Sequence, residues 1–170
     1  MNRLLAARRL APVLVAWGIP PGVAHQFEIE AKQDGAKVVE AEHMLLALTA
    51  ISDGEVAALL HEAGLDHERL ESALTEERRR TLAFAGMKAP DRALVAATEL
   101  ESPLSLGTSA KAAFKRALIG ARRERHRVHL RTKDLLAGIL EAELGTVPRA
   151  LAIAGIDRVT LASRAWGVKS

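Results

Sequence analysis

Apolar residues recur along this chain at spacings of three and four positions, which places them on one face of a helix. In the first half, this pattern predicts a helix that begins at Pro20-Pro21 and a second helix over about 41–51. A third helix is expected to end at Gly64, because glycine readily takes the left-handed conformation that terminates helices. Asp66 is then the predicted N-cap of a fourth helix, whose free first-turn N–H groups can donate to its carboxylate.

The same pattern occurs a second time. Gly54 and Gly64 recur as Gly145 and Gly155, 91 positions later in both cases. The shift also aligns apolar positions: Val39 with Leu130, Leu45 with Leu136, Leu48 with Ile139, Val56 with Val147, Leu60 with Leu151 and Leu70 with Leu161. Apolar positions and turn glycines are therefore retained while polar residues differ, which is typical of a duplicated fold whose packing has been kept.

Polar residues predict where the helices of the second half begin. Ser109 is the expected N-cap of a long helix, Thr132 is the expected N-cap of the next helix through Leu140, and Asp157 takes the place of Asp66. Between the halves, Gly86, Pro90, Pro103 and Gly107 mark a connector with a short helix predicted around 92–100. A connector of this length is either mobile or part of a binding surface.

These patterns predict an all-α fold of two tandem four-helix repeats with a short helix in front. The expected boundaries are an N-terminal extension at 1–18, repeat 1 at 19–75, a connector at 76–108 and repeat 2 at 109–166. The short helix covers about 3–16, and Pro12 is expected to kink or split it. Trp17 and Trp166 flank the repeats and are predicted to pack on their ends.

Composition supports helices and argues against several classes of protein. Ala, Leu, Arg and Glu dominate the 170 residues, and these residue types favour helices. The chain has no cysteine, which excludes disulfides and thiolate metal sites and fits the cytoplasm, where we expect the protein to be. The basic start followed by the apolar Leu10–Trp17 resembles a secretory signal, but Pro12 interrupts it and a cut after Ala24 would remove part of the first repeat. No apolar stretch is long enough to span a bilayer, so we expect a soluble protein without a membrane partner.

One segment carries a family resemblance. Residues 41–48 read Ala-Glu-His-Met-Leu-Leu-Ala-Leu and resemble the Thr-Glu-His-Leu-Leu-Leu-x-Leu signature of the Clp N-terminal repeat domain. Residues 64–70 are similar to the Gly-Val-Asp-x-x-x-Leu of that family, and 132–140 with 155–157 form the second copy. The resemblance spans about 20–166, and it is greatest to ClpC-like members.

The resemblance implies two four-helix motifs related by pseudo-twofold symmetry. In Clp unfoldases this domain docks adaptors and degradation substrates, and in ClpC-like members it recognises phosphoarginine and binds cyclic peptide antibiotics. The chain has no G-x-x-x-x-G-K-[ST] phosphate loop, so it resembles a stand-alone N-domain without an ATPase. No catalytic pair or cofactor loop stands out, and the chain is predicted not to be an enzyme and to need no cofactor.

The resemblance also marks candidate ligand-binding residues. Glu42 matches the glutamate that pairs with the guanidinium of phosphoarginine, although Ala41 replaces the neighbouring threonine. In the second copy Thr132 is kept, but Lys133 replaces the glutamate and would repel a guanidinium. Glu42 is alternatively a first-turn carboxylate that interacts with the helix dipole. His43 is either a ligand contact or a structural histidine, and none of the six histidines has a recognised metal-ligand spacing, so no metal site is predicted.

Two other groups of residues are candidate surfaces. Phe84 and Met87 either border an apolar groove between the halves or seal the joint between them. The main basic cluster contains Arg122, Arg123, Arg125, Arg127 and Arg131. It is a nucleic-acid surface, a dock for an acidic partner, or the solvated end of a helix. The mixed-charge run 76–80 is interpreted as a solvated helix face.

Together these features predict a non-enzymatic module that binds proteins or peptides. Its expected ligands are adaptors, degradation substrates, a Clp ATPase or protease, or a cyclic peptide antibiotic, and as a free domain it would act as a decoy or regulator of a Clp protease. The alternative is a basic helical protein that binds nucleic acid through the 122–133 cluster. This alternative is weaker, because Glu124 interrupts the cluster and no aromatic residue lies near it for stacking on bases.

Overall fold

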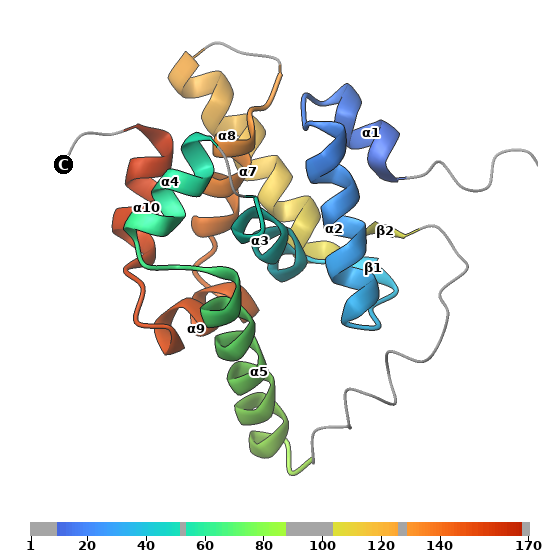
Figure 1. Ribbon diagram of the computed structural model, residues 1–170, viewed down its shortest axis with the longest axis vertical. Helices are drawn as coiled ribbons and strands as arrows, with labels where there is room; N and C mark the ends of the chain where they lie inside the picture. Colours follow the sequence, from blue (N-terminus) through green and yellow to red (C-terminus); the bar gives the residue numbers. More distant parts are fainter. Residues whose placement is uncertain (1–9, 52–53, 88–103, 126–128, 168–170) are drawn as a thin grey trace, which may run out of the picture.

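The computed structural model describes residues 10–51, 54–87, 104–125 and 129–167, and within α7 the side chains of 124 and 125 are not described. Helices make up most of these residues, which confirms the predicted all-α class (Figure 1). The predicted helix at 92–100 lies outside the described residues. In chain order the elements are α1 (Leu10–Ala16), α2 (Pro21–Gln33), β1 (Val38–Val39), α3 (Ala41–Thr49), α4 (Glu55–Glu62), α5 (His67–Phe84), β2 (Ser105–Leu106), α7 (Thr108–Arg125), α8 (Thr132–Leu140), α9 (Thr146–Ile153) and α10 (Arg158–Trp166).

The two halves follow the same plan. Helices α3, α4 and α5 begin at residues 41, 55 and 67, and α8, α9 and α10 begin 91 positions later, at 132, 146 and 158. Asp66 and Asp157 cap their helices as predicted, accepting backbone N–H groups at 2.7 Å and 3.1 Å. Gly64 and Gly155 end the preceding turns with φ of +70° and +69°. The local signals in the sequence therefore placed these turns correctly.

The halves are interlocked rather than placed end to end. Helix α4 of the first half packs against α8 and α10, and α9 of the second half packs against α3 and α5. Arg69 ties the two corresponding turns together, because its guanidinium donates to the carbonyl of Gly64 at 2.8 Å and to that of Ala154 at 2.6 Å. One hydrophobic core consequently runs through both halves.

Two predicted helix caps are wrong. Ser109 lies inside α7, which begins at Thr108, and Thr132 is the first residue of α8, whose N-cap is Arg131. In both cases a short polar residue suggested a local cap, but the residue in front of it begins the helix or occupies the cap position. The hydroxyl of Ser109 forms hydrogen bonds with the other half instead.

The fourth helix is longer than expected, and a small sheet was not foreseen. Helix α5 continues to Phe84, so 76–84 extend this helix, although the sequence analysis placed them in the connector. No glycine or proline interrupts the helix before Gly86. The valines at 38 and 39 pair in parallel with Ser105 and Leu106, which ties the start of α3 to the start of α7.

Both tryptophans contact α7. The ring of Trp17 meets Phe114 edge-on, with 5.3 Å between ring centroids and an interplanar angle of 67°. Trp166 lies over Gly120, where a Cβ would come within 2.1 Å of its ring, and its indole N–H donates to Glu141 at 2.7 Å. Each tryptophan thus packs against the long helix that opens the second half.

Helices α7 and α8 cross closely at Gly138, and this contact generates a stability prediction. A Cβ at this position would lie 2.5 Å from the Ala113 carbonyl oxygen and 2.7 Å from the Ala117 nitrogen, both of them backbone atoms. We expect Gly138→Ala to lower the free energy of unfolding by about 1–3 kcal/mol in urea denaturation, because the helices must move apart.

The matched control is Gly22→Ala. A Cβ at Gly22 in α2 meets nothing within 4 Å, so this variant should change stability by less than about 1 kcal/mol. Equal stability of the two variants would contradict the close crossing of α7 and α8.

Candidate functional site beside helix α3

Helix α3 runs through the middle of the molecule and contacts helices of both halves (Figure 1). Every residue from Ala41 to Leu48 is buried except Glu42, which is half-buried. An apolar helix in a shared core thus carries one carboxylate at its first turn. Burial takes water away from a carboxylate, so the groups around Glu42 determine whether its charge is stabilised.

The residue in front of α3 joins the two halves. The Glu40 carboxylate accepts hydrogen bonds from the N–H of Ser109 at 2.9 Å, from its hydroxyl at 2.6 Å and from the Thr108 N–H at 3.3 Å. The Ser109 hydroxyl oxygen accepts the N–H of Ala41 at 2.8 Å. A Cβ on Gly107 would lie 2.0 Å from Oε1 of Glu40, so glycine leaves the room that this carboxylate needs. Glu40 therefore caps α7, and its carboxylate already accepts hydrogen bonds from within the protein.

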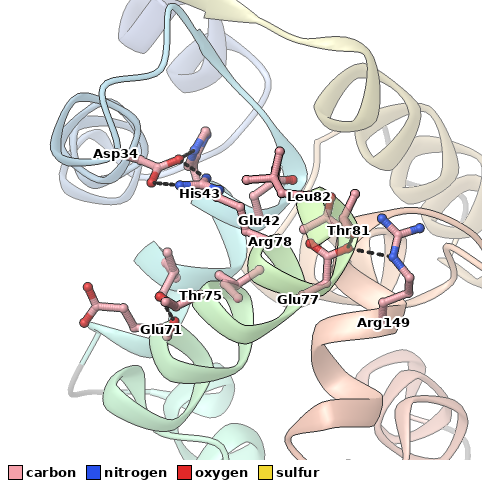
Figure 2. Close-up of a pocket in the computed structure, with 13 residues that line it drawn as sticks. Asp34, Glu42, His43, Glu71, Thr75, Glu77, Arg78, Thr81, Leu82 and Arg149 are labelled. Atoms are coloured by element: carbon pink, nitrogen blue, oxygen red, sulfur yellow. Dashed lines mark hydrogen bonds and ion pairs between the residues drawn. The ribbon is translucent and has the colours of Figure 1, made fainter. Parts of the chain in front are cut away.

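His43 and Arg78 converge on Asp34, as Figure 2 shows. His43 is 3% exposed, and its Nδ1 accepts the N–H of Glu40 at 3.0 Å, which leaves the hydrogen on Nε2, 3.4 Å from Asp34. Arg78 donates to both Asp34 oxygens, at 2.9 Å and 2.5 Å. Burial opposes ionisation of Asp34, but the hydrogen bonds from His43 and Arg78 outweigh it and hold the pKa of this carboxyl well below its usual range. Both ring nitrogens of His43 thus have protein partners, which favours its structural interpretation.

A second cluster joins α5 to α9. Glu77 is 5% exposed and accepts hydrogen bonds from Arg149 Nε at 2.7 Å and from the Thr81 hydroxyl at 2.8 Å. In Figure 2 this pair lies across α5 from Asp34. The run 76–80 was interpreted as a solvated face, and that interpretation is correct for Glu76, which pairs with Arg79 and Arg80 on the outside. It is wrong for Glu77, which is buried, whereas Arg78 stays exposed while its guanidinium reaches Asp34.

A cavity of about 230 Å³ lies between α3, α5 and α9, bounded by these two clusters. Glu42, Leu46, Leu74 and Thr146 line it as well. Burial raises the pKa of Glu42, and the charges of Glu40 and Asp34 act in the same direction. Its carboxylate forms no ion pair with any residue in the part of the chain that the structure describes.

Glu42 also lines a second hollow, of about 410 Å³, between α3, α7 and α9. Ala41, Ala112, Val147 and the exposed Leu144 give this hollow an apolar part, and Arg116, which donates to the Gly138 carbonyl at 2.7 Å, lines it as well. Glu42, which forms no ion pair with a described residue, thus lines both hollows, and its charge adds to that of Asp34 in raising the pKa of Arg78. This arrangement can hold a positively charged group whose apolar stem or neighbours lie against the surrounding side chains.

The corresponding position in the second half is filled differently. Lys133 on α8 is 9% exposed and forms an ion pair with Glu55 on α4. Arg131 lies beside Asp134, with 3.6 Å between Nε and Oδ2, while Thr132 lines a groove with Lys133 and Glu55. Lys133 and Arg131, which match Glu42 and Glu40, therefore each lie beside a carboxylate of the same chain.

Comparisons with known proteins identify the family of this chain. Residues 25–154 match the family model of the Clp repeat (R) N-terminal domain, which covers more than half of the chain. The chain belongs to the Clp N-terminal domain family. In Clp unfoldases this domain is a docking and adaptor-binding module.

Two solved Clp N-domains have a similar structure. The N-terminal domain of the caseinolytic protease associated chaperone ClpD from Arabidopsis thaliana is 20% identical, with 85% of this chain and 87% of that chain covered and a TM-score of 0.59. The N-domain of ClpV from Vibrio cholerae is 15% identical, with 100% and 97% covered and a TM-score of 0.56. At these identities the likeness shows the fold alone. No curated protein matches this Clp N-domain.

The apolar candidates of the connector lie away from the site. Phe84 ends α5, the helix that projects from the bundle in Figure 1, and its side chain is 96% exposed. Met87 is 61% exposed. Among the described residues, neither side chain seals the joint between the halves. Leu104, in contrast, is buried in the core.

The described residues of the basic cluster differ in their surroundings. Arg122 and Arg123 are exposed near the end of α7, whereas Arg131 lies beside the buried Asp134. The side chain of Arg125 and the whole of Arg127 lie outside the described residues. Within the described ranges, no helix is long and apolar enough to cross a membrane, and no group of three or more His, Asp or Glu side chains is arranged to hold a metal ion.

The sequence analysis missed the residues that surround Glu42. Asp34 and Arg149 were not singled out, and Glu77 and Arg78 were considered only as part of the run 76–80. Their pairs join positions that are 44 and 72 apart in the sequence, which no local pattern indicates. A signal for Glu77 was present. It continues the buried stripe of α5 that begins at Leu70.

The low pKa of Asp34 generates a prediction for stability. A carboxyl whose pKa is lowered by folding stabilises the protein above its unfolded pKa, and this contribution is lost as the pH falls toward the folded value. We expect Asp34→Asn to lower the free energy of unfolding by about 1.5–3 kcal/mol at pH 7. The difference from the wild type should shrink below about pH 4, near the pKa of an unfolded aspartate.

Urea denaturation at several pH values measures this effect, with Glu76→Gln as the control. Glu76 pairs with Arg79 and Arg80 in solvent, so its substitution should change stability little. A loss for Asp34→Asn that stays constant from pH 7 to pH 3 would argue against the ion pair with Arg78 as its cause.

Proposed function

We propose that this Clp N-domain is a non-enzymatic module that binds proteins or peptides by holding a cationic side chain against Glu42. The observation that carries the proposal is the state of this carboxylate: it is half-buried, burial raises its pKa, and no described cation pairs with it. A buried carboxylate without a partner is costly, and a ligand cation would remove that cost.

The other acidic groups around the cavity and the second hollow, Glu71 included, already have partners within the protein. Glu40 caps α7, Asp34 is held by Arg78, and Glu77 is held by Arg149. A ligand that bound to any of these carboxylates would have to break existing hydrogen bonds. Glu42 offers its charge without such competition.

A guanidinium fits this carboxylate best among the cationic groups of proteins, because it donates two parallel N–H bonds to the two oxygens. The first turn of α9, at Thr146, lines both hollows beside Glu42. Free N–H groups at a helix start favour phosphate, so a phosphorylated arginine is a candidate ligand in line with the family resemblance. The apolar part of the second hollow, with Leu144 and Val147, would accept neighbouring hydrophobic side chains of an adaptor, a degradation substrate or a cyclic peptide antibiotic.

A domain with this activity would act by sequestration. Bound to a ligand of a Clp ATPase or protease, the domain would lower the amount that reaches the unfoldase, and so serve as a decoy or regulator in the cytoplasm. Nucleic acid is a less suitable ligand, because Arg131 lies beside Asp134, whose carboxylate offsets its charge.

The test is a titration with short peptides that carry arginine, phosphoarginine or alanine at one position. We expect binding of a cationic peptide to the wild type, and a loss of about 10- to 100-fold in affinity for Glu42→Gln, which is the size of one charge-assisted hydrogen-bonded contact. Calorimetry gives the affinity, and a ligand-dependent rise in Tm supports it.

Glu68→Gln is the matched control, because Glu68 is an exposed carboxylate in the first turn of α5 and its removal changes the net charge equally. Equal losses for both variants would show that the peptides respond to overall charge. Binding of the alanine peptide or of a DNA duplex with the same affinity would contradict the proposal.

The raised pKa of Glu42 predicts how binding depends on pH. A cation needs the ionised carboxylate, so affinity should fall as the pH is lowered through the pKa of Glu42. Because burial places this pKa above the ordinary value of about 4.3, the loss should begin at a higher pH than for an exposed glutamate. Affinity for the arginine peptide, measured between pH 8 and pH 4, checks this expectation, and Glu42→Gln should show no such decline.

A further inference from the structure

The hollow beside Glu42 has a counterpart on the other side of the pseudo-symmetric core. The shift of 91 residues takes 40–42 to 131–133 and takes 145–147 back to 54–56. Segments 40–42 and 145–147 line the hollow of about 410 Å³ described above, which is called the first groove from here on. Segments 131–133 and 54–56 line the second groove. The duplicated scaffold therefore builds the same type of groove twice.

The charges in the two grooves are reversed. Glu40 corresponds to Arg131, and Glu42 corresponds to Lys133. Across the groove, Thr146 at the start of α9 corresponds to Glu55 at the start of α4. The first groove thus presents the Glu42 carboxylate opposite a neutral residue, with Arg116, which donates to the Gly138 carbonyl, also in its lining. The second groove presents an ammonium opposite a carboxylate.

In the second groove the two opposing groups bind each other. Lys133 Nζ and Glu55 Oε1 form an ion pair, with the lysine side chain 11% exposed and the glutamate side chain 59% exposed. A buried ammonium needs such a partner. Because Glu55 is part of the same chain, its carboxylate is always close at hand, and a free anion competes with it poorly. A cation is repelled by Lys133.

The Lys133–Glu55 pair also shows what the groove geometry can do. Lys133 in the first turn of α8 reaches across the second groove to Glu55 at the start of α4. The corresponding residues of the first groove are Glu42 and Thr146. Thr146 has no charge to offer. The partner that Lys133 finds within the chain is therefore missing for Glu42, which leaves room for a ligand.

We infer that the domain binds one cationic side chain per molecule, in the Glu42 groove, and that the Lys133–Glu55 pair closes the twin groove to cations by taking the place of a ligand. This inference rests on the proposed function, because it assigns the number and the location of the sites for the same class of ligand. Two residues, Lys133 and Glu55, set this one-sidedness.

The experiment counts the peptides bound per molecule by calorimetric titration of the full chain with the arginine and phosphoarginine peptides. The wild type should bind one peptide, and Glu42→Gln should bind none with comparable affinity. The double variant K133E/E55T places Glu and Thr at the two positions of the second groove that correspond to Glu42 and Thr146, and it should bind two peptides. Adding E42Q to this double variant should return the count to one.

Two further measurements keep the outcome clear. K133M/E55T removes the ion pair without adding an acid and should still bind one peptide, which separates opening of the groove from creation of a cation site. Circular dichroism and thermal unfolding establish that each variant is folded. If K133E/E55T does not fold, the wild type and E42Q still test the inference. It requires one bound peptide per molecule for the wild type and none for E42Q.

Failure of the inference differs from failure of the proposed function. A wild type that binds two peptides, an E42Q variant that keeps one site, or a folded K133E/E55T variant that binds a single peptide would overturn the one-sided site while leaving peptide binding intact. A wild type that binds neither peptide would overturn the proposed function, and the inference with it.

Discussion

The packing of each half against the other is the constraint on which the rest of this structure depends. The short helices α4 and α9 lie on the opposite half, and the polar groups that begin α3 and α7 satisfy each other through Glu40 and Ser109. A buried N–H or carboxylate without a partner is costly, so neither helix start is complete without the other half. The duplicated chain therefore behaves as one unit with a single core, and α3 is held in its centre.

This central position explains why a single carboxylate matters so much. Two acidic groups around Glu42 are matched, with Asp34 held by Arg78 and Glu77 by Arg149. These pairs fix α5 to α2 and α9 and shape the walls around Glu42. The proposed site thus combines walls that are held by hydrogen-bonded charges with a half-buried carboxylate that forms no ion pair with a described residue. A binding site needs rigid surrounding residues that hold the group that contacts the ligand in place.

Duplication adds a second consequence. A repeated backbone presents the same groove twice, but the side chains of the two copies are free to diverge as long as each buried charge finds a partner. In this chain the acid of one copy is a base in the other, and Lys133 found its partner in Glu55. Geometry is shared between the halves and charge is not. The Clp N-domain fold is consequently common to distant relatives, whereas ligand preference is decided by a few positions in each chain.

Local signals in the sequence by themselves determined the helical class, the repeat and most helix ends. Asp66, Asp157, Gly64 and Gly155 act on groups within a few residues, so their roles can be recognised from neighbouring positions alone. The family motif likewise pointed to Glu42. Only the tertiary structure decided that Ser109 bonds to Glu40 rather than to its own helix, that Arg78 pairs with Asp34, and that Lys133 is neutralised by Glu55. Each of these contacts joins residues at least 44 positions apart, and such pairings depend on how the helices pack, which no local pattern encodes.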